Sequence, residues 1–251
     1  MIASLPMYDW PEVREATDEW WAGIARHLGS DVLLTRSGNP PSDWRHGHVL
    51  FSQTCGYPYT HEFKGALDLV ATPHYAADGC DGPNYRSIIF ARERLPLEAL
   101  RGAKAAINNP DSMSGMLALR LVFPESLFFR KEVMTGGHLN SLAAVRDGNA
   151  DVCAIDCVSV ELARRYRPGA LDGLIEIARS PPVPGLPYVT RGGNIAELRA
   201  ALYLAFHDEG LEEARRKLLL TGYSVLSDDN YARILQLESE LHEQRSEPHG
   251  R

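Results

Sequence analysis

The chain has 251 residues, of which 44% are hydrophobic and 24% charged, enough apolar material for one large domain or two smaller lobes. No run approaches the roughly 18 uninterrupted apolar residues of a membrane span, so we expect a soluble protein. The formal net charge is −7 and the basic residues are dispersed, which excludes the basic face that nucleic-acid binding requires.

Strand and helix signals alternate along the chain. The predicted strands cover residues 2–7, 32–35, 49–52, 67–72, 85–91, 104–108, 151–155, 175–178 and 186–190. The predicted helices cover residues 11–28, 59–65, 96–100, 112–123, 138–148, the stretch after 155 up to 166, and most of 194–244. This alternation predicts an α/β fold built from parallel βα units, in which ligands bind at the carboxyl ends of strands.

Two strand-to-helix junctions carry small polar residues. After the first predicted strand Tyr8 is a candidate ligand contact, whereas Asp9 is as readily the N-cap of the next helix. After the strand at 49–52 come Gln53 and Thr54, with Tyr59 in the short helix that follows. A tyrosine here can stack on a ligand or simply pack in the core, and both interpretations stay open.

The strongest local signal follows the strand at 104–108. Ser112, Ser114 and Gly115 lie where the next helix begins, and free N–H groups, the helix dipole and two hydroxyls together favour an anion. The alternative is that Asp111 or Ser112 is only an N-cap.

Two further candidates come from the next βα unit. His138 lies at a helix start after two glycines, where a histidine can also be a cap or a surface residue. Asp156 follows directly on an apolar strand, so its carboxylate is expected at the ligand-binding edge of the sheet.

The four cysteines, Cys55, Cys80, Cys153 and Cys157, show no spacing typical of a zinc or thioredoxin site. We interpret them as reduced, partly buried thiols, and we expect no metal and no cofactor. The sequence also lacks a Ser-His-Asp order, a HExxH helix and a glycine-rich nucleotide loop.

Five segments in chain order carry a resemblance to a known family: Leu5-Pro-Met-Tyr8, Gln53-Thr-Cys-Gly56, Asn109-Pro-Asp-Ser-Met-Ser-Gly115, Gly137-His138 and Ala150-Asp-Val-Cys-Ala-Ile-Asp156. Together they resemble the phosphate/phosphite/phosphonate substrate-binding proteins of ABC transporters, over about residues 2–190. The resemblance implies a two-lobed type II periplasmic-binding fold with mixed sheets and a hinge of extended strands. Its expected lobes are residues 1–88 with 188–251, and residues 89–187, with hinge strands near 86–91 and 187–190.

The resemblance also implies a function, the reversible capture of a small phosphonate- or phosphate-like anion in a cleft between the lobes. Ser112, Ser114 and Gly115 would hold the anionic group, His138 would add a donor, and Asp156 would contact the rest of the ligand. An ABC permease is the implied partner. The N-terminus shows no secretory signal, which predicts a cytoplasmic solute-binding or sensing protein if Met1 is the native start and a periplasmic one if a leader was removed.

Two other functions stay open at this point. One is an enzyme on the same fold, with His138 and Asp156 as an acid–base pair or Cys55 as a nucleophile at a helix start. The other is a regulatory module that uses its helical tail, where Ile234, Leu237 and Leu241 recur at spacings of three and four. Such a stripe is more often an intramolecular packing face.

Overall fold

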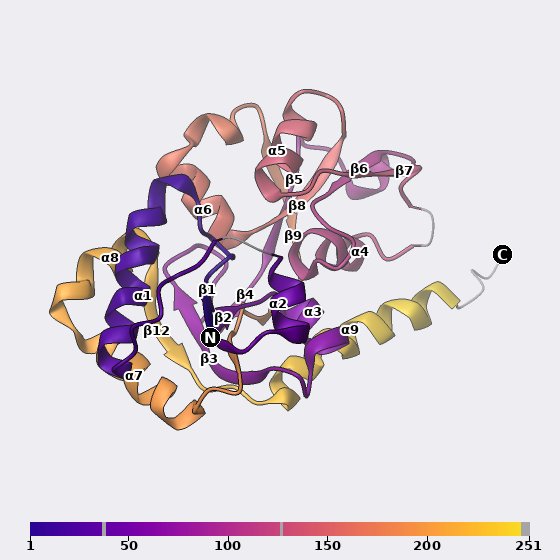
Figure 1. The fold of residues 1–251 in the computed structure, drawn as a ribbon. Coiled ribbons are helices and arrows are strands. Elements are labelled where there is room, and N and C mark those ends of the chain that lie inside the picture. The colour runs from indigo at the N-terminus through magenta and orange to yellow at the C-terminus, as the bar shows by residue number, and fades with distance from the viewer. Residues whose placement is uncertain (37–38, 126–127, 247–251) are drawn as a thin grey trace. The chain divides into compact units, whose positions relative to one another are not determined.

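The computed structural model describes residues 1–36, 39–125 and 128–246 (Figure 1). The chain forms two compact units. Unit 1 contains residues Met1–Ala76, Asp81–Asn84 and Pro184–Tyr231, and unit 2 contains Ala77–Cys80, Tyr85–Val183 and the chain from Ala232 onward. The lobe boundaries expected from the sequence stay a prediction. Within the described ranges, none of the helices has both the length and the apolar character needed to cross a bilayer.

Unit 1 is built on a five-stranded mixed sheet in the order β1-β2-β11-β3-β12. Its strands are β1 (Ile2–Ser4), β2 (Val49–Gln53), β3 (Asp68–Tyr75), β11 (Tyr188–Arg191) and β12 (Leu220–Ser224). β1 and β2 are parallel, whereas β11 runs antiparallel to both of its neighbours and β12 antiparallel to β3. The expected α/β class with mixed sheets is confirmed, although fewer strand pairs are parallel than the alternation predicted.

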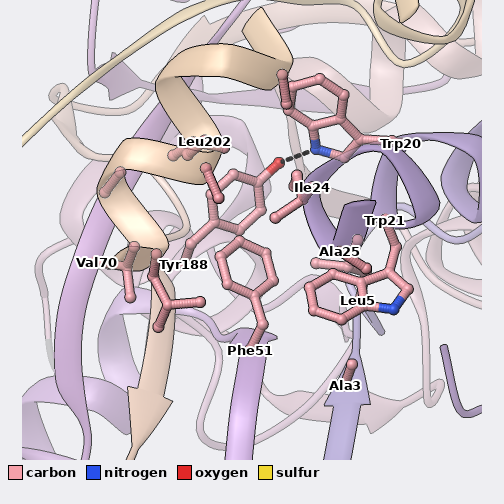
Figure 2. Packing of buried hydrophobic residues seen from close by; sticks show 14 of the residues in the cluster. Ala3, Leu5, Trp20, Trp21, Ile24, Ala25, Phe51, Val70, Tyr188 and Leu202 are labelled. Carbon is pink, nitrogen blue, oxygen red and sulfur yellow. Dashed lines mark hydrogen bonds between the residues drawn. The ribbon is translucent and has the colours of Figure 1, made fainter. Parts of the chain in front are cut away.

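Helix α1 (Arg14–Leu28) packs against this sheet and begins after a short 3₁₀ turn, η1 (Pro11–Val13). It ends because Gly29 adopts a left-handed conformation, with φ 70°, and its N–H caps the last turn. The apolar face of α1 places Trp20 and Trp21 in the core, and the Trp20 indole donates to the Tyr188 hydroxyl at 3.2 Å (Figure 2).

The other helical elements of the N- and C-terminal segments are short, except for α7 and α9. They are α2 (Pro40–His46), α3 (Gly56–Pro58), the π turn η2 (Tyr59–Phe63), α7 (Ile195–His207), η6 (Glu209–Leu211), α8 (Glu212–Lys217) and α9 (Asp228–Ser246). The tail stripe of Ile234, Leu237 and Leu241 on α9 is buried, so it is a packing face within the chain.

Unit 2 contains a second five-stranded mixed sheet in the order β7-β6-β8-β5-β9. Its strands are β5 (Ser87–Ala91), β6 (Lys104–Ile107), β7 (Lys131–Met134), β8 (Val152–Asp156) and β9 (Ile175–Arg179). Its helical elements are η3 (Leu97–Leu100), the π turn η4 (Met113–Leu117), α4 (Ala118–Val122), α5 (His138–Arg146), α6 (Cys157–Tyr166) and η5 (Pro168–Leu171). β6 is parallel to β7 and β8, so the helices that follow β6 and β8 begin at one edge of the sheet.

The two segments expected to act as hinges are paired within the sheets, and their role as hinges stays a prediction. Residues 87–91 form β5, which is hydrogen-bonded to β8 and β9, and residues 188–191 form β11, which lies between β2 and β3. The chain changes unit at 76/77, 80/81, 84/85, 183/184 and 231/232. Two of these changes fall within β4 (Asn84–Tyr85) and β10 (Val183–Pro184), which pair as a two-stranded sheet.

Four local predictions also differ from the structure. Residues 32–35 form only an isolated bridge from Ala3 to Leu34. The expected turn at Asn39 to Asp43 begins helix α2, because two prolines fit a first helical turn and Trp44 is buried behind them. Strands β7 and β12 were not predicted: β7 is an exposed edge strand without an apolar pattern, and β12 lies in a stretch expected to be helical.

Candidate functional site

The polar turn after β6 brings Ser112, Ser114 and Gly115 together, as the sequence predicts. Ser112 is the N-cap of η4, with φ −97° and ψ 126°, and its Oγ accepts a hydrogen bond from the Gly115 N–H at 3.0 Å. Ser114 Oγ lies 3.5 Å from Ser112 Oγ. Both serines are buried, so their hydroxyls are fixed in place rather than freely solvated.

Glycine is required at position 115 for a steric reason. A Cβ atom there would lie 1.7 Å from Asn108 Oδ1 and 2.6 Å from Asn108 Cγ. The Asn108 Oδ1 atom is itself buried and has no hydrogen-bond partner among the residues that the structure describes. Sequence reasoning missed Asn108, although its place at the end of a predicted strand was the available signal.

The start of α5 adds a histidine to the same cluster. His138 is the first residue of the helix, and its Nε2 lies 3.0 Å from Ser114 Oγ and 3.3 Å from Asp156 Oδ2. The preceding turn uses Gly136 at φ 77°, a conformation that favours glycine. The side chain of His138 is 16% exposed.

Asp156 comes to the cluster from the end of β8, all five residues of which are buried. It is the N-cap of α6, where Oδ1 accepts a hydrogen bond from the Ser159 N–H at 2.8 Å and Oδ2 faces His138. The N-cap role, which was not predicted, and the contact with His138 therefore belong to the same carboxylate.

Three helical segments of unit 2 thus begin close together: Ser112 is the N-cap of η4, His138 is the first residue of α5, and Asp156 is the N-cap of α6. The side chains at these three starts are connected through Ser114 and His138. Helix N-termini carry partial positive charge and favour anions. The Asp156 carboxylate lies among these helix starts and is already one such anionic group. We call Ser112, Ser114, Gly115, His138 and Asp156 the polar cluster.

Burial lowers the pKa of His138, and the Asp156 carboxylate and the Ala154 backbone oppose part of that shift. Its Nδ1 atom is buried and has no partner of hydrogen-bonding geometry within the described part of the chain. Nε2–H beside the Asp156 carboxylate is the electrostatically favoured arrangement, and Ser114 Oγ then accepts from it. The proton of Ser114 is then not used in the contact with His138.

The enzyme alternative meets a geometric objection in the polar cluster. In a Ser-His-Asp triad, serine and carboxylate contact different ring nitrogens, which lets the imidazole relay a proton between them. Here Ser114 and Asp156 both approach Nε2 of His138. The other candidate nucleophile, Cys55, is the N-cap of the three-residue helix α3 in unit 1. In the described residues, no three His, Cys, Asp or Glu side chains are grouped to hold a metal ion.

Two of the expected contacts from unit 1, Tyr8 and Gln53, line a small pocket together with Tyr75. Tyr8 has a positive φ of 58°, which is uncommon outside glycine and asparagine, and its ring makes an edge contact with Tyr75 at 5.3 Å. The Gln53 amide donates to the Tyr75 hydroxyl at 2.9 Å and to the Leu186 carbonyl at 3.1 Å. Tyr75 was not predicted, because it lies beyond the expected end of its strand.

The other two expected contacts, Thr54 and Tyr59, point into unit 1. Thr54 is fully buried, and its N–H donates to the Pro187 carbonyl at 3.1 Å. The Tyr59 hydroxyl donates to Asp228 at 2.5 Å, and burial together with that hydrogen bond raises the pKa of Tyr59. For Tyr59 the structure gives a packing role that joins η2 to the start of α9, and a ligand contact at either residue stays a prediction.

Comparison with solved structures shows the fold. A binding-protein component of an ABC phosphonate transporter from Pseudomonas aeruginosa aligns with a TM-score of 0.77 and 18% identity, over 96% of this chain and 86% of that one. PhnD1 from Prochlorococcus marinus, solved with methylphosphonate, aligns with a TM-score of 0.72 and 13% identity, over 96% and 98%. A protein from Xanthomonas citri, solved with ATP, aligns with a TM-score of 0.69 and 19% identity, over 98% and 99%.

The family is shown by the sequence itself. Residues 2–231 match the family described as "ABC transporter, phosphonate, periplasmic substrate-binding protein". That description implies a small transported ligand and a permease as partners of its members, and it places those members in the periplasm. The match spans both units and every residue of the polar cluster. The chain therefore belongs to the family of periplasmic substrate-binding proteins of phosphonate ABC transporters.

Proposed function

We propose that this protein captures a small phosphonate- or phosphate-like anion at the polar cluster of unit 2 and presents it to an ABC permease. The observation that supports this most directly is the meeting of three helix starts, in which Ser114 Oγ lies 3.0 Å from His138 Nε2 and that atom lies 3.3 Å from Asp156 Oδ2. Membership of the phosphonate family and the methylphosphonate complex of a protein with the same fold point to the same ligand class.

Each member of the polar cluster has a separate part in this proposal. Ser112 and Ser114 donate their hydroxyl protons to the anionic oxygens, and the free N–H groups at the start of η4 add further donors. His138 takes up a proton when the anion arrives, because a nearby negative charge favours the imidazolium form, in which both ring nitrogens donate. Asp156 cannot donate when ionised, so it favours ligands that carry an amine or hydroxyl beside the anionic group.

The test is calorimetric titration with methylphosphonate, 2-aminoethylphosphonate, phosphite and phosphate. One charge-assisted hydrogen bond contributes about 1.5–3 kcal/mol, so Ser114→Ala is expected to weaken binding roughly 10- to 150-fold. Ser224→Ala is a matched control, since Ser224 Oγ makes the same kind of contact with a histidine, 2.8 Å from His74 Nε2, in unit 1. Silence of the wild-type protein across all four anions would count against the proposal, as would equal losses in the two variants.

The preference for an amine has its own arm in this experiment. Asp156→Asn removes the negative charge and keeps an oxygen that can cap α6. We expect it to lose affinity for 2-aminoethylphosphonate and to gain affinity for phosphate. The dissociation constant for 2-aminoethylphosphonate therefore rises and that for phosphate falls. If both constants change by the same factor, Asp156 does not select the ligand.

A further inference from the structure

Two cysteines of unit 2 lie in contact. Cys80 Sγ is 3.3 Å from Cys157 Sγ, although 77 positions separate the two residues along the chain. Cys80 is on the loop between β3 and β4 and is partly exposed, whereas Cys157 is buried as the first residue of α6. Both carry reduced thiols.

The loop that carries Cys80 is held closely against this helix start. Asp78 forms a two-pronged ion pair with Arg179 of β9, at 3.0 and 2.7 Å. Gly79, at φ 113°, lies so near α6 that a Cβ atom there would be 3.0 Å from Cys157 Cβ. The absence of a side chain at position 79 is therefore what allows the loop backbone to approach Cys157.

We propose that Cys80 and Cys157 are a reversible covalent modification site, at which a disulfide forms within unit 2 by reaction with an external disulfide. The sulfur atoms must come closer by only about 1.2 Å to reach the roughly 2.05 Å of an S–S bond. The periplasm to which the family is assigned is a compartment in which disulfides form and persist.

The exchange proceeds in two balanced steps. The Cys80 thiol, which is the more accessible of the two, loses its proton and attacks the external disulfide RSSR, giving a Cys80–SR mixed disulfide and one RS⁻. The Cys157 thiol then loses its proton and attacks Cys80 Sγ, which forms the internal S–S bond and releases the second RS⁻. The two released thiolates take up the two protons, so the protein is oxidised by two electrons and RSSR is reduced to two RSH.

The reduced pair is stable in the absence of an oxidant. The hydrogen bond with Cys157 and burial raise the pKa of Cys80, which keeps the attacking thiol protonated near neutral pH. Cross-linking is therefore expected to be slow at neutral pH and to accelerate as the pH rises. Cys153 is fully buried, and burial raises its pKa also, so it offers no competing site.

The experiment uses the full-length reduced protein and oxidised glutathione under native conditions. The thiol titre should fall from the four cysteines of the chain to two, and peptide mapping by mass spectrometry should find residues 80 and 157 joined. The cross-linked form should melt about 5–10 °C higher than the reduced form, and dithiothreitol should reverse both changes.

Variants identify the pair. Cys80→Ser and Cys157→Ser should each abolish the cross-link, whereas Cys55→Ser and Cys153→Ser should leave it intact. A thiol titre that stays at four, a glutathione adduct that never resolves into an internal bond, or a bond to Cys55 or Cys153 would overturn the proposal. Peptide mapping of the wild-type protein decides the matter even if a variant fails to fold, and none of these readouts requires a bound ligand.

Discussion

A single methyl group at position 115 should disrupt the polar cluster. In Gly115→Ala the new Cβ would lie 1.7 Å from Asn108 Oδ1, whereas ordinary van der Waals contact begins at about 3.4 Å. The backbone N of Asn108 is 3.4 Å away, so the side chain of Asn108 and the turn around it must move, but the β6 backbone need not. Overpacking of this kind costs about 1–3 kcal/mol.

The free energy of unfolding, measured by urea titration and circular dichroism, should therefore fall by that amount. Binding of 2-aminoethylphosphonate should weaken at least tenfold, because the N–H of residue 115 donates to Ser112 Oγ and moves with the turn. Calorimetry on the folded variant at low temperature separates this effect from the loss of stability.

Gly137→Ala is the matched control, one residue before the start of α5. Apart from its two chain neighbours, no heavy atom of the described residues lies within 4 Å of its added Cβ, and its φ of 177° is extended backbone open to any residue. Its stability should be unchanged or raised by up to about 1 kcal/mol. Equal stability and equal ligand affinity in the two variants would refute the steric argument for glycine at position 115.

Three further predictions concern stability. Burial lowers the pKa of His138 in the folded state, so as the pH falls the unfolded chain binds a proton at His138 before the folded chain does. The free energy of unfolding should therefore have its full value above about pH 6.5 and decrease below that pH by at most about 1.4 kcal/mol per pH unit. Urea titrations between pH 5 and 8 should show a shallower fall for His138→Gln, and an unchanged slope would contradict this. Tyr231→Phe should lower the free energy of unfolding, measured by calorimetry, by about 1–3 kcal/mol. The reason is that the buried Tyr231 hydroxyl is hydrogen-bonded to Thr72 Oγ1 and to the Gly185 carbonyl, each at 2.8 Å. An unchanged free energy would mean that water takes the place of the hydroxyl. Asp156→Ala should lose about 1 kcal/mol more than Asp156→Asn in the same assay, because only the latter keeps a cap on α6, and equal losses would exclude the capping role.

The parts of the fold that could be predicted have strong local signals. Helix α1 follows a proline in η1, has an apolar face and ends at a glycine, and each of these features acts within a few residues. Strand β8 is buried along its whole length, so an apolar run correctly predicted a strand with a helix after it, whereas the N-cap role of Asp156 was not predicted. The grouping of Ser112, Ser114 and His138 followed from the topology, because parallel strands direct successive helix starts to one edge of a sheet.

The remaining features depend on tertiary contacts that local patterns do not encode. Strand β12 has glycine in its middle and only one buried end, and it is a strand because it pairs with β3. Tyr59 was a candidate ligand contact, and its hydroxyl bonds to Asp228, a partner 169 positions away along the chain that no local pattern indicates. The steric contact between Asn108 and Gly115 likewise depends on how η4 folds back on the end of β6.

The position of β11 in the sheet of unit 1 determines the order in which the polypeptide can fold as it leaves the ribosome. β11 lies between β2 and β3, so a nascent chain that has not reached residue 191 holds two strands with no partner along their inner edges. All five strands of the other sheet lie between residues 87 and 179 and are available earlier. Unit 2 is therefore expected to fold first, while the N-terminal strands wait with unpaired edges that invite aggregation and call for chaperone protection.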